Sequence, residues 1–486
     1  MPLTETILLD PATDATLAAA RLACSPRSTP GLVPWSSHAI HAAVLAMWAG
    51  VFAAAFGFSN IYAWSAGLVY VAYDAALLAF VFVRTLPLLA PAPRGAALVQ
   101  GETLGVIVAA HNEAMVLPRT IETLLAQADA PQVILIADDG STDATAAVLH
   151  AAFGLVPPAL GEVAGAGPVR WLRLPHGGKA RALNAALTRL DTELVVTVDA
   201  DTLLRPGAIS AVRRAFAADP RLVATTGVLI PLCAKTASGR VLEWFQTYEY
   251  IRNFLSRYAW AGLDCLLLIS GAFGGFRRSA LLAVGGFDPD GLVEDYELIH
   301  RLKRHSALGG LRWTTRVLGD AQAWTEAPSS LPAFVRQRRR WFGGFLQTQF
   351  WYREMVGARR YGALGLVMLP IKAIDAVQPF YGLTALAILL AAAFGEQSLV
   401  APIFGIIGAK LALDLAFHGW SVMLHRRWLG DTTGATMLGA LVAGALEPFT
   451  FQILRHVSAA WGWGLFLAGR QTWVGQRRQD ALRAAP

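Results

Sequence analysis

Two aspartates at the end of an apolar run are the first residues whose spacing could support chemistry. The stretch "VVTVDADTLL" places Asp199 and Asp201 directly after a run long enough for one buried strand. Side chains alternate along a strand, so both carboxylates would point the same way. Neighbouring carboxylates repel each other, and their oxygens are the ligands that a hard divalent cation prefers. The pair predicts a metal site, although a polar turn at a strand end would use the same residues.

Two more polar clusters follow strand-like runs. "AAHNE" ends in His111, Asn112 and Glu113, and "DDGSTD" begins with Asp138 and Asp139. In the second cluster, Ser141 or Thr142 would cap the next helix, which leaves an acid free to bind a ligand.

A glycine pair precedes a third candidate. "HGGKARALN" places Lys179 at a helix start, a location suited to phosphate. The stretch is not a Walker A loop, because Ala180 stands where Ser or Thr is required. A dinucleotide fold is also excluded, because no G-x-G-x-x-G motif follows the first strand-like run.

The elements that must position these residues alternate between strand-like and helix-like segments over residues 104–227. Such alternation predicts a mostly parallel sheet with helices on both faces. Ligands of these sheets bind beyond the carboxyl ends of the strands. We therefore expect the polar clusters to lie along one rim of the sheet.

The composition indicates a membrane protein. The 486 residues are 55% hydrophobic and 15% charged, whereas about a quarter of an ordinary chain is charged. Residues 39–58 contain no Asp, Glu, Lys or Arg, and residues 61–83 carry only Asp74. With a second apolar region over 361–470, these spans enclose a mixed-composition domain.

The net charge of +7 gathers beside the apolar segments. By the positive-inside rule, these flanks and the enclosed domain lie in the cytoplasm. Because the charge is not spread over one face, no nucleic-acid partner is expected. The basic flanks are Arg84, Arg94, 336–340, Arg359, Arg360, 425–427 and 476–479.

Ionisable residues also occur inside the apolar regions. Lys410 and Asp414 lie one helical turn apart and would compensate each other in lipid. Alternatively, they would join Asp74, Glu447 and Arg455 in lining a polar passage. Residues 434–468 carry Glu447-Pro448 near their middle, so we expect a broken helix there.

The order of motifs resembles the family 2 glycosyltransferases, and more narrowly the membrane-embedded cellulose, chitin, hyaluronan and poly-N-acetylglucosamine synthases. It runs "AAHNE", "DDGSTD", "GGKARALN", "DAD", "SGAFGGFRR", "GGFDPDGLVEDYEL" and "QRRRW". The resemblance covers residues 100–345 by motif. It implies an α/β GT-A fold, a Rossmann-like mixed sheet, as a cytosolic domain inserted between transmembrane helices.

The resemblance also assigns roles to residues. Asp199 and Asp201 would hold Mg²⁺ or Mn²⁺ against a nucleotide-sugar diphosphate. Asp295, with Glu294 beside it, would be the general base, although both could be ordinary first-turn acids of a helix. Val293 replaces the Thr of the family's T-E-D motif. The nucleotide-sugar site would comprise His111, Glu113, Asp138, Asp139, Lys179, Asp199, Gln337 and Arg340.

The acceptor site follows from two further motifs. Trp341 of Q-x-x-R-W would stack on the acceptor sugar, and Gly271 with Phe273 would form the acceptor segment. The alternative for the first motif is a helix at the membrane surface, with Phe334 in the interface and arginines on lipid phosphates. The alternative for the second is a strand bent by its glycines.

The function implied is an inverting, metal-dependent hexosyltransferase that polymerises a UDP-sugar into a β-linked polysaccharide. One-sugar transfer to a lipid or glycan precursor is the alternative, and a non-catalytic scaffold ranks last. Partners would be a UDP-sugar, a growing glycan, membrane lipid, and export or regulatory subunits. The protein is expected to be a multi-pass protein of a bacterial-type inner membrane.

The expected domains follow from these assignments. They are a cytosolic tail (1–38), a transmembrane hairpin (39–84), the GT-A domain (100–330), amphipathic interface helices (331–360), a transmembrane region (361–470) and a basic cytosolic tail (471–486).

Overall fold

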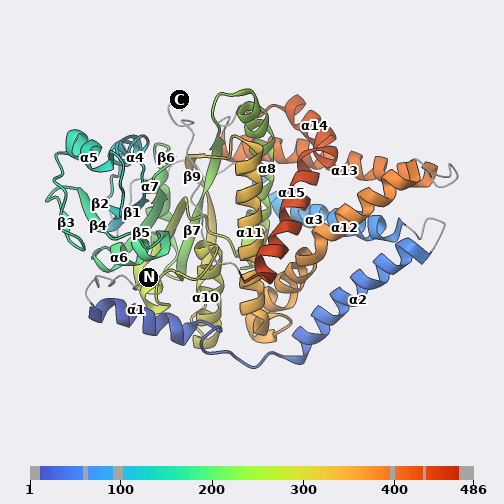
Figure 1. The fold of residues 1–486 in the computed structure, drawn as a ribbon, viewed down its shortest axis with the longest axis horizontal. Helices are drawn as coiled ribbons and strands as arrows, with labels where there is room; N and C mark the ends of the chain where they lie inside the picture. Colours follow the sequence, from blue (N-terminus) through green and yellow to red (C-terminus); the bar gives the residue numbers. More distant parts are fainter. Residues whose placement is uncertain (1–10, 58–63, 91–101, 394–399, 431–433, 470–486) are drawn as a thin grey trace.

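The computed structural model describes residues 11–57, 64–90, 102–393, 400–430 and 434–469. A nine-stranded sheet with the order β3-β4-β2-β1-β5-β8-β7-β9-β6 forms its centre. Long apolar helices extend from one side of this sheet (Figure 1). The expected mixed α/β domain flanked by apolar helices is confirmed.

The elements fall into three groups. The strands are β1 (Leu104–Ala110), β2 (Val133–Asp139), β3 (Val163–Ala164), β4 (Val169–Leu174), β5 (Leu194–Asp199), β6 (Thr202–Leu204), β7 (Leu222–Leu232), β8 (Phe273–Arg277) and β9 (Thr314–Glu326). The helices of the domain are α4 (Leu117–Leu125), α5 (Thr145–Phe153), α6 (Lys179–Thr188), α7 (Ala208–Ala218), α8 (Ala237–Ala261), α9 (Arg278–Ala283) and α10 (Glu294–Gly309). Helix α11 (Leu331–Trp351) follows them, and the remaining helices are α1 (Pro11–Cys24), α2 (Trp35–Gly57), α3 (Ser65–Thr85), α12 (Leu369–Ala393), α13 (Val400–Leu429), α14 (Met437–Leu446) and α15 (Phe451–Leu467).

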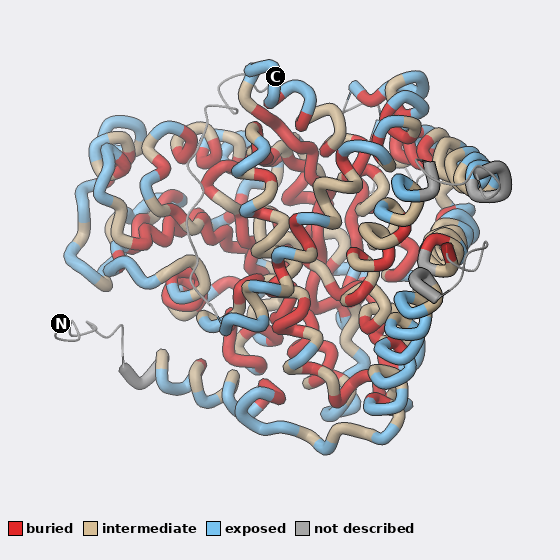
Figure 2. Tube along the Cα trace, turned by 45° about the vertical axis from the view of Figure 1, so that its right-hand side comes forward, coloured by how far each residue is buried: buried red, intermediate tan, exposed pale blue. Residues whose placement is uncertain are grey.

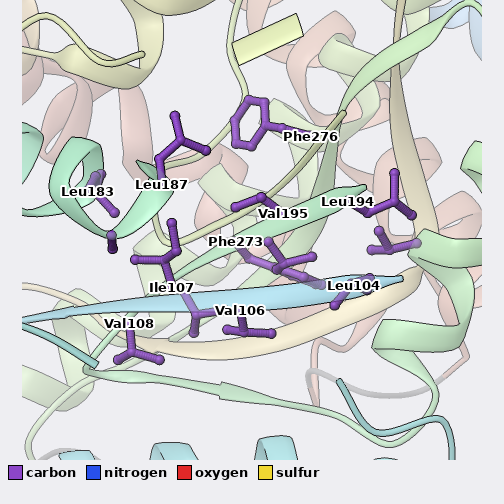
Figure 3. Packing of buried hydrophobic residues seen from close by; sticks show 14 of the residues in the cluster. Leu104, Val106, Ile107, Val108, Leu183, Leu187, Leu194, Val195, Phe273 and Phe276 are labelled. Atoms are coloured by element: carbon purple, nitrogen blue, oxygen red, sulfur yellow. The ribbon is translucent and has the colours of Figure 1, made fainter. Parts of the chain in front are cut away.

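The first half of the sheet is parallel and carries the main core. Strand β1 pairs with β2 and β5, and β2 pairs with β4, all in parallel. Every residue of β1 except Ala109 is buried, as expected for a strand covered on both faces. Figure 3 shows apolar side chains of β1, β5, β8 and α6 packed together around this strand.

The alternation over residues 104–227 did not predict the pairings in the second half of the sheet, although the family resemblance implied a mixed sheet. Strand β8 runs antiparallel to both β5 and β7, and β7 runs parallel to β9. The pairing of β7 with β9 shifts register twice, between Leu222 and Ala224 and between Thr226 and Val228. The antiparallel insertion turns a simple parallel sheet into a mixed one and brings α10 toward the carboxyl edge of β5.

The apolar helices could cross a membrane. Among the described residues, four are long and apolar enough, spanning Trp35–Ala54, Gly67–Leu89, Leu364–Ala391 and Phe404–Leu429, and there are five if α14 and α15 form one bent span. In the first two, only 11% of the most apolar window is buried by protein. Figure 2 shows that residues at the centre of the molecule are largely buried, whereas many residues of the outlying helices are exposed. Apolar surface of this extent favours lipid as its environment.

The break expected in the last apolar segment is confirmed. A 47° bend separates α14 from α15, and the 3₁₀ turn Glu447–Phe449 lies between them. Proline at position 448 cannot donate a helical hydrogen bond, which accounts for the interruption. The expected tail 471–486 and the first ten residues of the tail 1–38 lie outside the described residues.

The N-terminal segment reaches back to the loop that leads into α10. Arg21 Nη1 donates to the carbonyl oxygen of Gly285 at 3.0 Å. Arg27 lies 2.8 Å from Asp290 Oδ2 and 3.4 Å from Asp288 Oδ2. A Cβ at Gly285, where φ is +79°, would lie 2.2 Å from the Arg21 backbone nitrogen. Residues 11–34 are thus packed directly on the turn before Glu294.

Candidate active site

The parallel strands bring the polar clusters to one edge of the sheet. Ala110 is paired with Asp138 across β1 and β2, and Ala109 is paired with Asp199 across β1 and β5. The ends of all three strands therefore lie side by side. The edge predicted from strand alternation is the one that the structure forms.

The Asp199/Asp201 pair differs from the expected alternation. Strand β5 ends at Asp199, and Asp201 lies in the following turn. The Asp199 side chain is 29% exposed, whereas Asp201 is 8% exposed and lies within 3.5 Å of the Thr202 hydroxyl. Side chains two residues apart point the same way only within a strand. Because β5 ends at Asp199, the carboxylates of Asp199 and Asp201 have different surroundings.

Lys179 joins the ends of three elements. Its Nζ lies 2.5 Å from Asp199 Oδ1 and 3.4 Å from Glu294 Oε1. Burial alone would lower the pKa of Lys179, but Asp199 and Glu294 outweigh it and raise that pKa. The side chain therefore stays an ammonium ion. Lys179, Asp199, Glu294 and Asp295 are called the Lys179 cluster below.

The two acids at the start of α10 have opposite shifts. Burial and the adjacent Glu294 carboxylate raise the pKa of Asp295, and Lys179 opposes them only in part. Burial would raise the pKa of Glu294 too, but Lys179 and Arg340 outweigh it and lower that pKa. Adjacent acids whose pKa values are pushed apart commonly divide acid–base work, and the raised one is the better proton acceptor near neutral pH.

Gly271 lies against the cluster. Its backbone N–H donates to Asp295 Oδ2 at 2.8 Å. A Cβ at this position would lie 3.1 Å from Lys179 Nζ and 3.2 Å from Asp295 Oδ2. Glycine thus allows the backbone to approach both charged groups and to orient the Asp295 carboxylate.

Arg257 of α8 is a residue that sequence reasoning missed. Burial lowers its pKa to about 10, opposed by the Asp295 carboxylate. Among the described residues it makes no ion pair within 4 Å, and its guanidinium stacks 4.7 Å from the Phe254 ring centroid. Its position follows from how α8 crosses the sheet, for which no motif in "EYIRNFLSR" gave a signal.

Helix α11 contributes the Q-x-x-R-W residues. Arg340 Nη1 donates to the Leu292 carbonyl at 3.1 Å and acts electrostatically on both acids of α10. Gln337 is 9% exposed, and its Oε1 has no hydrogen-bond partner among the described residues. The Arg338 guanidinium lies over the Trp341 ring, with its Cζ 4.5 Å from the ring centroid. Gln337 thus offers an acceptor that a bound hydroxyl could satisfy.

The membrane-surface alternative for α11 is wrong for two of its residues. Phe334 is fully buried and packs on Phe451, with ring centroids 4.9 Å apart. Arg338 pairs with Glu249 at 2.6 Å instead of facing lipid phosphate. Phe334 faces α15, which packs along α11, and Arg338 faces Glu249 of α8.

Asp138 and Asp139 have different partners. Asp138 accepts from the Trp171 indole at 3.2 Å and from the Ser141 amide at 2.9 Å, so it is directed toward β4. Asp139 accepts from the Gly177 amide at 2.7 Å and the Gly178 amide at 3.0 Å. The amides expected to bind phosphate therefore hold a carboxylate in this structure.

His111 and His176 enclose the same aspartate. His111 Nδ1 lies 2.7 Å from the Asp139 carbonyl oxygen, and His176 Nδ1 lies 3.0 Å from Asp139 Oδ2. Their rings stack with centroids 4.3 Å apart. Among the described residues, His111, Asp139 and His176 make up a group of side chains whose ligand atoms lie close enough together to hold a metal ion. Glu113, assigned to the same edge, is 4% exposed and precedes α4 by four residues, so it is not a first-turn helix acid.

Two local assignments need correction. Phe273 is fully buried in the core, where Figure 3 shows it near Val195, so it cannot contact an acceptor sugar. Neither Ser141 nor Thr142 caps α5; Asp143 Oδ1 instead accepts from the Thr145 amide at 3.0 Å. The helix begins later than expected because the turn is held by Asn112, whose Oδ1 accepts from the Thr142 amide at 2.8 Å.

The ionisable residues of the apolar helices form two groups. Lys410 lies 2.7 Å from Asp74 and also contacts Asp414, so the expected compensating pair includes a third residue. Glu447 lies 2.7 Å from both Arg252 and Arg455. Both groups line a small cavity of about 70 Å³. Asp74, Lys410 and Asp414 are called the Lys410 cluster below.

Comparison with known proteins identifies the domain. Residues 194–407 match the model for glycosyl transferase family group 2. Poly-beta-1,6-N-acetyl-D-glucosamine synthase from Staphylococcus epidermidis is 29% identical over 259 residues, which are 52% of this chain and 57% of that protein. The enzyme of the same name from Staphylococcus aureus strain COL is 29% identical over 247 residues, 50% of this chain and 54% of that protein. This chain thus spans a little over half the length of these relatives.

A solved structure shows the same fold. A mannosyltransferase from Pyrobaculum calidifontis, in complex with GDP-Man and Mn²⁺, superimposes with a TM-score of 0.52 at 21% identity. The match covers 80% of this chain and 99% of that one. The GT-A fold and the family 2 resemblance expected from the motifs are confirmed.

Proposed function

We propose that this chain, whose central domain is a family 2 glycosyltransferase domain, polymerises a UDP-sugar into a β-linked polysaccharide at a membrane. The observation that carries the proposal is the Lys179 cluster, which joins Asp199 to the two acids of α10 at the open edge of the sheet. Helix α11 places Arg340 close enough to act on both acids of α10 and packs along the apolar helix α15. The similarity to polysaccharide synthases supports polymerisation as the outcome.

The donor site would include a divalent cation. Asp199 and Asp201 supply hard oxygen ligands, and the Lys179 ammonium 2.5 Å from Asp199 supports a positive charge beside that carboxylate. When bound, Mg²⁺ or Mn²⁺ would neutralise charge on the departing diphosphate. The Mn²⁺ and GDP-Man of the similarly folded mannosyltransferase support this assignment.

The remaining nucleotide contacts follow from the edge of the sheet. His111 and Asp139 would contact the nucleoside, because both lie where β1 and β2 end. Lys179 and Arg340 would bind the diphosphate, since guanidinium and ammonium groups form strong hydrogen bonds with phosphate oxygens. Lys179 would move from the carboxylates to the diphosphate as donor binds.

The reaction would be a single in-line displacement. Asp295 takes the proton from the acceptor hydroxyl, and that oxygen attacks the anomeric carbon as the bond to the diphosphate breaks. The products are a lengthened glycan, UDP and a protonated Asp295. The raised pKa of Asp295 suits this role, because a carboxylate with a higher proton affinity is a stronger base. An α-linked donor would yield a β-linkage.

The acceptor would approach beside α11. Gln337 Oε1 is available to a sugar hydroxyl, Trp341 would stack on the sugar ring, and Gly271 leaves space beside the base. The apolar helices would hold this opening at the bilayer, with the domain on the cytoplasmic side of a bacterial-type inner membrane. The basic ends of α3 and α13 support that orientation.

The test is radiolabel incorporation by the full chain in nanodiscs, offered a panel of UDP-sugars with Mg²⁺ or Mn²⁺. Asp201→Asn and Asp295→Asn run in parallel, with products sized by gel. A long, glycosidase-sensitive product that is lost in both variants and after chelation is expected. A single-sugar adduct would refute polymerisation, and no turnover with any donor by the folded protein would refute the transferase assignment.

A further inference from the structure

A cavity of about 350 Å³ lies where α3 meets the transferase domain, away from the proposed active site. It is lined by Val83, Arg84 and Pro87 from the end of α3 and the turn after it, by Tyr258 and Gly262 at the end of α8, and by Arg316 of β9. Each side of the cavity therefore contributes one arginine, Arg84 from the span and Arg316 from the domain, beside uncharged residues.

Arg84 points its charge at this cavity without an acidic partner. Its Nη2 donates to the Gly262 carbonyl at 2.8 Å, and its buried Nε has no partner among the described residues. No described carboxylate lies within 4 Å of its guanidinium. A Cβ at position 262 would lie 2.6 Å from Arg84 Nη2, so glycine is what allows the guanidinium to occupy this place.

The second arginine leaves the cavity positive overall. Arg316 lies 2.8 Å from Asp219, and Asp219 also lies 3.6 Å from Arg221. One carboxylate is thus shared between two guanidinium groups. Together with Arg84, the cavity and its rim carry more positive than negative charge.

The cavity lies at the level expected for lipid headgroups. Arg84 is in the last turn of α3, and Arg426 and Arg427 are in the last turn of α13, so two candidate spans end here with basic residues. The rings of Phe82 and Trp420 lie 4.4 Å apart. Aromatic and basic side chains gather in this way where a bilayer meets water.

Apolar surface continues from the cavity along the span. Phe82, Val83 and Leu86 are 41%, 58% and 40% exposed beside Arg84. An occupant with a negatively charged head and an apolar tail would match both parts. Because an arginine guanidinium pairs with phosphate through two hydrogen bonds, a phosphate head fits the arginines of the cavity.

We propose that this cavity binds the phosphate of an anionic phospholipid, with the acyl chains lying along α3. The site would fix the height and tilt of the transferase domain on the membrane, since Arg84 belongs to a span and Gly262 and Arg316 belong to the domain. The inference rests on α3 crossing the bilayer and is independent of the proposed transferase reaction.

The test measures thermal unfolding of the full chain in neutral detergent, with phosphatidylglycerol, phosphatidylcholine or inorganic phosphate added. Phosphatidylglycerol is expected to raise Tm by on the order of 2–4 °C more than phosphatidylcholine does. Arg84→Gln should remove that difference. Arg359→Gln is the matched control, because this exposed arginine of the turn Arg359–Tyr361 is outside the cavity and should leave the difference intact.

Three results would overturn the proposal. These are an equal shift with phosphatidylcholine, an equal shift with inorganic phosphate, and a full phosphatidylglycerol shift in both Arg84→Gln and Arg316→Gln. If Arg84→Gln does not fold, native mass spectrometry compares the wild type with Arg316→Gln. Arg316→Gln should retain fewer bound phosphatidylglycerol molecules, and equal retention would again refute the site.

Discussion

The molecule contains two clusters in which a lysine lies between two carboxylates, and they differ in what surrounds them. In the Lys179 cluster, Nζ lies 2.5 Å from Asp199 and 3.4 Å from Glu294, and a third acid, Asp295, stands beside them. In the Lys410 cluster, Nζ lies 2.7 Å from Asp74 and contacts Asp414.

The difference is one surplus acid and the exposure of the lysine. The Lys179 side chain is 26% exposed and the Lys410 side chain 12%. The first cluster has three acids for its lysine and the second has two, and burial together with Glu294 keeps the pKa of Asp295 raised. The second sits between apolar helices, where compensation of charge is itself a requirement. We therefore expect the chemistry at the cluster that has the third acid and the more exposed lysine.

The largest expected effect separates the clusters by activity. Asp295→Asn should lower turnover by about 10²–10⁴-fold, the usual contribution of a general base, with little change in Tm. Asp414→Asn is the matched change in the Lys410 cluster and should keep most of the turnover, because Asp74 still pairs with Lys410. Rates are measured with the donor that supports incorporation. Equal losses in the two variants would contradict the distinction.

The next effect separates them by stability. Lys410→Met should destabilise the protein by about 3–5 kcal/mol, because two carboxylates between apolar helices lose their counter-ion. Lys179→Met should cost less, since water reaches that more exposed cluster and screens its acids. Thermal unfolding in detergent compares the two. A larger loss for Lys179→Met would show that the Lys179 cluster is the structural one.

A smaller effect concerns how tightly the Lys179 cluster is built. Gly271→Ala places a Cβ about 3 Å from both Lys179 Nζ and Asp295 Oδ2, so those groups must shift by a few tenths of an ångström. Turnover should fall by about tenfold, since modest misplacement of a reacting group is costly. Gly167→Ala is the control, because its Cβ would meet nothing within 4 Å. Unchanged turnover in Gly271→Ala would indicate that the base is loosely held.

The smallest effect is a displacement of the pH profile. Asp295 must be deprotonated to act, so turnover is lost as pH falls through its pKa. Burial and the Glu294 carboxylate both raise that pKa. Glu294→Gln removes the second cause, so the acidic limb of the residual activity should move to lower pH. A limb that stays in place or moves upward would mean that another group titrates.

The sequence predicted the parallel half of the sheet well. The run "LGVIVAA" coincides with β1, because a parallel strand that is buried on both faces is a continuous apolar stretch. Strands β7 and β9 gave no comparable signal. Strand β9 mixes charged, small and aromatic residues over Thr314–Glu326, and its pairing with a distant strand is decided by tertiary packing.

The motifs named candidate residues for the site but not the contacts among them. Motifs located Lys179, Asp199 and Asp295, whereas the bridge between them depends on α6, β5 and α10 meeting at one point. Arg257 was missed because its role depends on the path of α8 and on no local pattern. Phe273 was misassigned because a motif position does not tell which side of a strand faces the core.

The contacts of residues 11–34 with the loop before α10 impose an order on biosynthesis. Arg21 and Gly285 are 264 residues apart, and a similar length of chain separates Arg27 from its partner Asp288. Helices α2 and α3, two of the candidate membrane spans, leave the ribosome within that interval, before the partners of Arg27 exist. The loop beside Asp295 therefore forms its contacts with Arg21 and Arg27 only after strands β1 to β8 have been made, while β9 has still to follow.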